Sequence, residues 1–100
     1  MMRHALITAG SKGLGKKVSE QLLKDGCNVT INYRSDEAAV KRLKDEWSVY
    51  KDQLLFVQGD VTKKEDIVHI VDEAFSAFGT IDFLINNAGP YIFERKKLVD

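Results

Sequence analysis

The 100-residue sequence predicts a single α/β domain in which a parallel sheet is covered by helices on both faces. Short apolar runs alternate along the chain with segments whose apolar residues have helical spacing, in the order β-α-β-α-β-α-β. The runs are mostly apolar throughout, as expected for strands that are buried on both faces of a parallel sheet. Strands that alternate with helices in this way are joined by right-handed crossovers.

The first strand and helix are predicted within the first 26 residues. Residues 5–7 form the first apolar run, which we interpret as a strand. From Leu14 onward, apolar residues recur four positions apart at Val18 and Leu22, which is helical spacing. Gly26 then suits the left-handed position that commonly follows the end of a helix.

The second strand and helix follow directly. Residues 29–31 are a largely β-branched run, typical of a strand. Ser35 and Asp36 offer side-chain oxygens that can cap the next helix. The apolar stripe expected to bury that helix consists of Val40, Leu43 and Trp47.

The second half of the chain predicts one more helix between two strands. Residues 54–57 and 81–85 are the apolar runs. Thr62 and Glu65, three positions apart and just before an amphipathic segment, predict a capping box at the start of the helix. Gly79 is expected to end it. Residues 91–100 are half apolar and half charged, and their pattern assigns them to neither a helix nor a strand.

Composition narrows the classes of function. Lys+Arg and Asp+Glu are balanced at 15 each, so nothing favours nucleic acid or an anionic membrane surface as a partner. No run resembles a signal peptide or a membrane span. The single cysteine, Cys27, favours a cytoplasmic protein and is interpreted as an apolar filler. His4, placed before the first strand, and His69 lack the spacing of metal ligands, so we predict no metal site.

A glycine-rich stretch, TAGSKGLG from Thr8 to Gly15, joins the first strand to the first helix. Glycines let the backbone approach a phosphate closely, and the amino end of a helix offers free N–H groups and a positive dipole end. Gly10, Gly13 and Gly15 therefore predict a phosphate-binding loop. The alternative is a tight strand-to-helix turn that binds no ligand.

Three motifs at successive strand ends resemble those of the short-chain dehydrogenase/reductase family. The loop fits the pattern T-x-G-x-x-G-x-G, although Ala9 departs from the family's stricter T-G-x-x-x-G-x-G. Residues 86–89 read N-N-A-G, as in the family, and Asp60 with Val61 resembles its Asp-containing segment near the adenine. The resemblance covers nearly the whole chain and is greatest to bacterial 3-oxoacyl-[acyl-carrier-protein] reductases.

This resemblance implies a Rossmann-type sheet with strand order 3-2-1-4, the N-terminal half of a doubly wound fold. Its cofactor crevice lies beside the first and fourth strands. The resemblance further implies that Asn87 ties neighbouring strands together, while Ala88 and Gly89 leave room for the nicotinamide side. The predicted cofactor-binding residues are Gly10, Ser11, Lys12, Gly13, Leu14, Gly15, Tyr33, Arg34, Ser35, Asp60, Val61, Asn87, Ala88 and Gly89.

The residues after the second strand predict NADP(H) as the cofactor. An NAD-dependent enzyme places an acidic residue there for the ribose 2′-hydroxyl. Here Tyr33 occupies that place, followed by Arg34, whose guanidinium can bind a 2′-phosphate, and Ser35. Lys12 adds a second cation. The alternative is that Arg34 and Lys12 are ordinary solvated surface charges.

No catalytic residue is predicted in these 100 residues. The family's Tyr-x-x-x-Lys pair is absent: Tyr33 and Tyr50 have no lysine four positions on, and Tyr91 is followed by Arg95. We therefore expect the chain to be the cofactor-binding N-terminal part of a longer oxidoreductase, inactive alone, with residues 91–100 starting the substrate-side region. The full enzyme would act on a small carbonyl or alcohol substrate and form a homo-oligomer.

Two other interpretations remain open from the sequence. The chain could be a small NADP-binding module that is complete at this length and pairs through its fourth strand. It could also be a structural remnant that binds nothing. For the 100 residues taken alone, we expect the fourth strand to form an unpaired apolar sheet edge and the third helix to cover its face of the sheet nearly alone.

Overall fold

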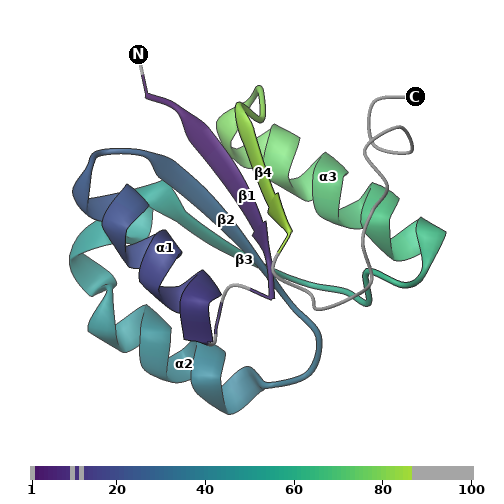
Figure 1. Ribbon diagram of the computed structural model, residues 1–100, viewed down its shortest axis with the longest axis horizontal. Coiled ribbons are helices and arrows are strands. Elements are labelled where there is room, and N and C mark those ends of the chain that lie inside the picture. The colour runs from purple at the N-terminus through teal and green to yellow at the C-terminus, as the bar shows by residue number, and fades with distance from the viewer. Residues whose placement is uncertain (1, 10, 12, 87–100) are drawn as a thin grey trace.

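A four-stranded parallel sheet lies at the centre of the computed structural model, which describes residues 2–9, 11 and 13–86 (Figure 1). The strand order is β3-β2-β1-β4, so the predicted order 3-2-1-4 is confirmed. All three neighbouring pairs are parallel. The strands are β1 (His4–Thr8), β2 (Asn28–Tyr33), β3 (Leu54–Gln58) and β4 (Phe83–Asn86).

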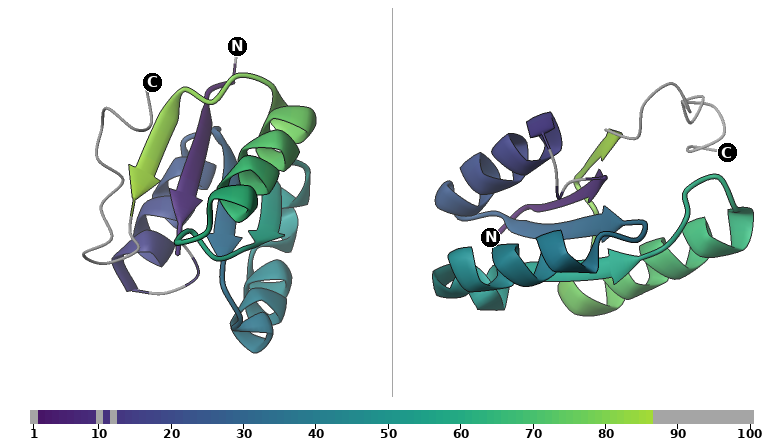
Figure 2. Two further views of the ribbon diagram at one scale, coloured as in Figure 1. Left: turned by 90° about the vertical axis from the view of Figure 1, so that its right-hand side faces the viewer. Right: turned by 90° about the horizontal axis from the view of Figure 1, so that it is seen from below.

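Helices cover both faces of this sheet, as predicted. α1 (Gly13–Lys24) and α2 (Glu37–Glu46) share one face, and α3 (Lys64–Phe78) lies on the other (Figure 2). A short 3-10 helix, η1 (Ser48–Gln53), leads from α2 into β3. Within the described part of the chain, no helix has the length and apolar character needed to cross a membrane.

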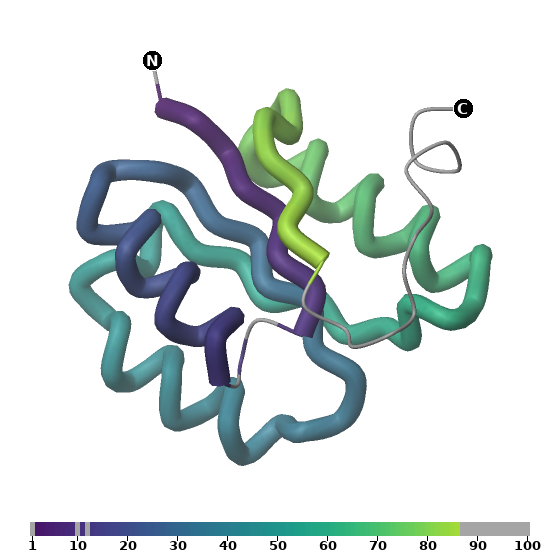
Figure 3. Tube along the Cα trace, viewed as in Figure 1, coloured from purple at the N-terminus to yellow at the C-terminus, as the bar shows by residue number. Residues whose placement is uncertain are grey.

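The central strand β1 is buried along its whole length between β2 and β4 (Figure 3). Alternate side chains of a strand point to opposite faces. Ala5 and Ile7 therefore belong to the core under α1 and α2, whereas Leu6 belongs to the core under α3. Trp47, only 2% exposed, joins the first of these cores, which confirms its predicted place on the buried stripe.

The helix boundaries follow three of the predicted local signals. Gly26, after α1, and Gly79, after α3, both have a positive φ, of 89° and 75°. Glycine adopts this conformation without the steric cost that a side chain would add. Asp36 caps α2, because its carboxylate accepts a hydrogen bond from the Ala39 N–H at 3.0 Å.

The predicted capping box of α3 is wrong. The helix starts at Lys64, with Lys63 at the cap position and no side-chain cap bond. The Thr62 hydroxyl instead donates to Asp60 Oδ1 at 2.6 Å, and the Thr62 N–H donates to the same oxygen at 2.9 Å. Thr62 is held by a stronger, ionised acceptor, so it is not available to the helix.

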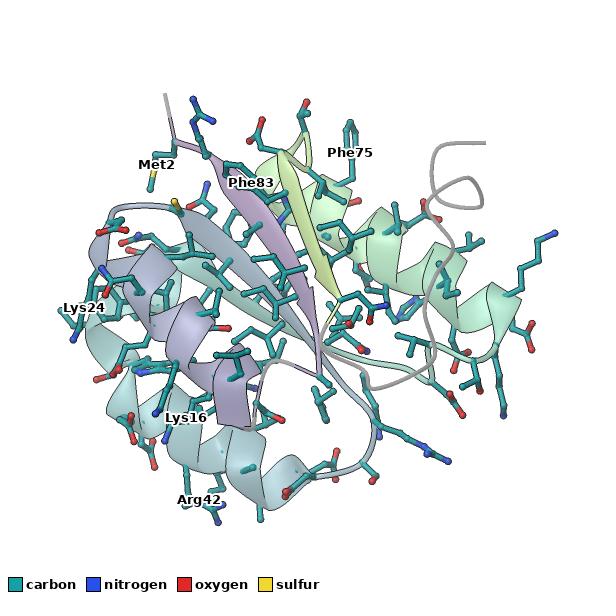
Figure 4. The ribbon with its side chains drawn as sticks, viewed as in Figure 1. Met2, Lys16, Lys24, Arg42, Phe75 and Phe83 are labelled. Carbon is teal, nitrogen blue, oxygen red and sulfur yellow. The ribbon has the colours of Figure 1, made fainter. Side chains whose placement is uncertain are left out.

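The edge formed by β4 is apolar and partly open, in agreement with the prediction. Within the described residues β4 pairs with β1 alone, and Phe83 and Leu84 are 38% and 40% exposed. α3 is the sole described helix on its face, and Phe75 is 58% exposed (Figure 4). The apolar surface of this half of the molecule is therefore less covered than that beneath α1 and α2.

Candidate cofactor-binding site

A cleft of about 430 Å³ opens at the carboxyl ends of β1 and β2. Because parallel strands end on the same side of the sheet, the loops that follow these two strands lie together there (Figure 1). Its lining residues are Ala9, Ser11, Gly13, Leu14, Tyr33, Arg34, Ser35 and Asp36. The structure thus brings together the described glycine-loop residues and the segment that follows β2.

The first wall of the cleft is the start of α1. Gly13, the first residue of the helix, has φ of 53°, and a Cβ placed on it would meet no atom within 4 Å. The first turn of α1 carries no acidic side chain, whereas Glu37 occupies the first turn of α2. An anion placed at this helix end would therefore meet a positive dipole end without a competing carboxylate from that turn.

The backbone before α1 also has an unusual conformation. Ala9 has φ of 53°, and it is the one described residue other than glycine with a positive φ. It is also the residue at which the sequence departs from the family pattern, where a glycine follows the threonine. The left-handed conformation explains why glycine is suited to this place.

The second wall consists of the residues that follow β2. The Arg34 side chain is 79% exposed, while its carbonyl oxygen accepts a hydrogen bond from Gln58 Nε2 at 3.1 Å. The Tyr33 ring packs edge-to-face on Phe56, with ring centroids 6.5 Å apart. The backbone of this segment is thus anchored to β3, and the Arg34 guanidinium extends into solvent beside the cleft.

Asp60, after β3, lies next to this wall. Its Oδ2 is 3.8 Å from the Nε of Arg34, so two of the predicted residues form an ion pair. Hydrogen bonds from the Thr62 side chain and backbone lower the pKa of the Asp60 carboxyl, and the charges of Arg34 and Lys63 add to this effect. These contacts therefore favour the ionised form of the carboxyl group.

Val61 is placed differently from its neighbour Asp60. It packs against the core beneath α3 and lines a small apolar cavity of about 30 Å³ there, apart from the cleft. The structure thus places Asp60 beside Arg34 of the cleft wall, whereas Val61 packs toward α3. The predicted residues Gly10, Lys12, Asn87, Ala88 and Gly89 lie outside the described part of the chain.

Two polar side chains that hold the sheet near the site were not among the predicted residues. The Thr8 hydroxyl donates to Asn86 Oδ1 at 2.9 Å, which joins the carboxyl ends of β1 and β4. Asn32 donates from Nδ2 to the carbonyl oxygens of Val57 and Gly59, at 3.3 and 3.0 Å. The signal for Asn32 was present in the sequence, since an amide at the end of an apolar run needs hydrogen-bond partners when buried.

The two histidines and the cysteine, all of them in the described part of the chain, do not line the cleft. His4 begins β1 rather than preceding it and is fully buried, so it is a packing residue. His69 is exposed on α3, and Cys27 is partly buried against the core beneath α1 and α2. No group of three or more His, Cys, Asp or Glu side chains in residues 2–9, 11 and 13–86 is arranged to hold a metal ion.

The fold is an α/β domain with a cleft at the carboxyl ends of β1 and β2, and comparison with known proteins places it in a family. The family model described as short chain dehydrogenase matches residues 3–99. The chain belongs to the short-chain dehydrogenase family, which confirms the family resemblance found in the sequence.

Individual relatives give the same assignment. YtkK of Bacillus subtilis, an oxidoreductase by name, is 68% identical over 99 residues, covering 99% of this chain and 39% of YtkK. The 3-oxoacyl-[acyl-carrier-protein] reductase FabG of Staphylococcus epidermidis is 32% identical over 89 residues, covering 89% of this chain and 36% of FabG. This chain therefore spans about two fifths of the length of these relatives.

Solved structures share the fold closely. A Bacillus thuringiensis protein, a 3-oxoacyl-reductase by name, is 62% identical with a TM-score of 0.87, covering 100% of this chain and 41% of that protein. ElxO, solved with NADP bound, is 38% identical with a TM-score of 0.76, covering 87% of this chain and 35% of ElxO.

Proposed function

We propose that this chain is the cofactor-binding part of an NADP(H)-dependent oxidoreductase that interconverts a small carbonyl compound and its alcohol. One observation carries the proposal: the cleft beside the amino end of α1 is lined by Arg34 and Ser35, with no acidic residue at the end of β2. A cationic side chain at that place favours a ribose 2′-phosphate over a 2′-hydroxyl.

The residues present fit this cofactor. Gly13 and Ser11 would receive the pyrophosphate at the amino end of α1, because that helix end presents N–H groups and leaves the space around Gly13 open. Arg34 would pair with the 2′-phosphate, and Ser35 would add a hydroxyl donor. The bound nicotinamide supplies the hydride for the reaction, and the residues of this chain bind and orient the nucleotide.

We also propose Gly10, Lys12, Gly15, Asn87, Ala88 and Gly89 as parts of the same site, from their place in the family motifs. The NADP-bound ElxO structure supports the choice of cofactor, because that protein shares this fold at 38% identity. In this proposal the protein is cytoplasmic and oligomeric, and its substrate-binding residues follow the part described above.

Cofactor titration tests the proposal. The dissociation constants of NADP⁺ and NAD⁺ are measured by calorimetry for the wild type, for Arg34→Ala and for Arg42→Ala. Arg42, exposed on α2, provides the matched control for loss of one surface charge (Figure 4). Loss of a charge-assisted contact of about 1.5–3 kcal/mol weakens NADP⁺ binding roughly ten- to a hundredfold in Arg34→Ala.

The two cofactors distinguish the outcomes. NAD⁺ lacks the 2′-phosphate, so its affinity is expected to be similar in all three proteins. An unchanged NADP⁺-to-NAD⁺ preference in Arg34→Ala would show that Arg34 does not select the cofactor. Failure of the wild type to bind either nucleotide would refute the cofactor assignment itself.

A further inference from the structure

Arg34 contributes both to the lining of the cleft and to an ion pair with the Asp60 carboxylate. Arg34 lines the cleft, yet its Nε is 3.8 Å from Asp60 Oδ2. The two partners differ in exposure, because the Arg34 side chain is 79% exposed and that of Asp60 is 20% exposed. The arginine is therefore the partner that can change position, and the carboxylate is the fixed one.

Three hydrogen bonds hold Asp60 in place, two of them on its carboxylate and one from its backbone N–H. Asp60 Oδ1 accepts from both the N–H and the hydroxyl of Thr62, at 2.9 and 2.6 Å. The Asp60 N–H donates to Asp66 Oδ2 at 2.8 Å. With Oδ1 occupied by Thr62, it is Oδ2 that faces the arginine.

The preceding residue is also fixed. The Gly59 N–H donates to the Tyr33 carbonyl oxygen at 2.9 Å, which joins the segment after β3 to the end of β2. Asp60 consequently follows a segment that is tied to the residue next to Arg34. We therefore expect the Asp60 carboxylate to stay near the Arg34 guanidinium whichever of the two nucleotides is bound.

We propose that Asp60 is a specificity-determining residue that competes with the cofactor 2′-phosphate for the Arg34 guanidinium and thereby limits the preference for NADP(H) over NAD(H). This inference rests on the proposed function. A phosphate that binds Arg34 must draw it from Asp60 or share it with a carboxylate of like charge, and both weaken the contact. A 2′-hydroxyl makes no such demand, so Asp60 affects the two cofactors unequally.

The test is the ratio of the NAD⁺ and NADP⁺ dissociation constants, measured by calorimetry on the purified protein. Asp60→Asn removes the charge, while its amide oxygen can still accept the two hydrogen bonds from Thr62. An exposed ion pair is a weak interaction, so the variant is expected to raise the preference for NADP⁺ about two- to fivefold. Any contact between residue 60 and the adenine is common to both cofactors and cancels in the ratio.

A second background isolates the role of Arg34. In Arg34→Gln protein, the Asp60→Asn change should leave the ratio unaltered, because the group for which Asp60 competes is gone. Asp52→Asn is the matched control. Asp52 is exposed on η1, which precedes the start of β3, whereas Asp60 follows the end of that strand. The control should leave the ratio as in the wild type.

Each other result is informative. An unchanged or lower preference for NADP⁺ in Asp60→Asn overturns the proposal, and a lower one would show that Asp60 orients Arg34 toward the phosphate. An equal increase with and without Arg34 also overturns it, because the effect would then be direct repulsion of the phosphate. If Arg34→Gln itself leaves the ratio unchanged, Arg34 does not bind the 2′-phosphate. The proposed role of Arg34 and the competition with Asp60 are then both wrong.

A wild-type measurement covers the case in which the Asp60 variant does not fold. The nitrogen NMR resonance of Arg34 Nε is recorded in the NAD⁺ and NADP⁺ complexes. Competition predicts different resonances, because the guanidinium stays with Asp60 in the NAD⁺ complex and moves toward the phosphate in the other. Coincident resonances, in a protein that prefers NADP⁺, would refute the competition alone.

Discussion

The imidazole Nε2 of His4 lies 2.7 Å from the hydroxyl of Thr30, and both residues are fully buried where β1 and β2 pair. The other ring nitrogen, Nδ1, is 3.4 Å from the Gly79 carbonyl oxygen. The ring also packs edge-to-face on Phe78, with centroids 5.1 Å apart. One imidazole thus joins two strands to the end of α3.

This burial makes the stability of the protein depend on pH. Burial lowers the pKa of His4 below its ordinary 6.5, against opposing effects of the Gly79 and Thr80 backbone and the Asp82 charge. The unfolded chain therefore takes up this proton more readily than the folded one. The His4 contribution to the free energy of unfolding is complete above about pH 6.5 and decreases as the pH falls below it.

Urea unfolding at about pH 7.5 and about pH 5.5 checks this expectation. His4→Gln should lower stability at the higher pH but lose less of it on acidification than the wild type does. His69→Gln, in which an exposed histidine is replaced, should keep the wild-type pH dependence. Equal acid sensitivity of the wild type and His4→Gln would contradict the assignment to His4.

The cap of α2 gives a second prediction. Asp36→Ala removes the acceptor of the Ala39 N–H and should lower the free energy of unfolding by about 0.5–2 kcal/mol. Asp36→Asn keeps a capping oxygen and should lose much less. Asp45→Ala, at an exposed position late in the same helix, controls for a changed charge. Denaturant titration of the three variants measures the differences, and a full loss in Asp36→Asn would argue against the cap.

Gly59 gives a third prediction, which concerns packing against α3. A Cβ at this position would lie 2.9 Å from Ile70 Cδ1, and Ile70 is only 2% exposed. Gly59→Ala should therefore destabilise the fold by about 1–3 kcal/mol. Ile70→Val removes the atom concerned, so the double variant should lose less stability than the sum of the two single ones. Strict additivity in thermal unfolding would show that this contact is not the cause.

The strained backbone at Ala9 gives a fourth prediction. A residue with a side chain in the left-handed region carries a cost of about 1–2 kcal/mol, and glycine is entropically less favourable by about 0.5–1 kcal/mol. Ala9→Gly should thus raise the free energy of unfolding by up to about 1 kcal/mol, whereas Ala9→Val should lower it. The unfolding temperatures of the two variants and the wild type, measured by calorimetry, check both expectations. A clear destabilisation by glycine would show that the Ala9 methyl group contributes more than the strain removes.

The fold could be predicted well because several independent patterns in the sequence indicated the same helices and strands. The apolar runs, the glycines after α1 and α3 and the Asp36 cap all depend on residues close in the sequence, and each was confirmed. The capping box of α3 failed because its threonine had a competing acceptor in Asp60, two positions earlier. A pattern of residue types states which bonds are possible, but only the folded backbone decides between two acceptors.

The site was predictable only in part, for a related reason. The place of the cleft follows from the meeting of parallel strand ends, so Ser11, Gly13 and Arg34, which line it, could be predicted from the sequence. The ion pair of Arg34 with Asp60 joins residues from two different loops, and no spacing rule connects them. The burial of His4 also depends on distant parts of the chain, because Thr30 and Gly79 supply the partners of its ring.

The sheet order also has a consequence for the time at which each strand pairs. The contact between His4 and Thr30, across β1 and β2, spans 26 positions, whereas that between Thr8 and Asn86, across β1 and β4, spans 78. Closing the longer loop costs about 1 kcal/mol more in chain entropy, so we expect β4 to join last. Leu84→Ala should then speed unfolding more than it slows folding. Until β4 pairs, β1 therefore has one open edge. While the chain is being synthesised, another chain can reach this edge.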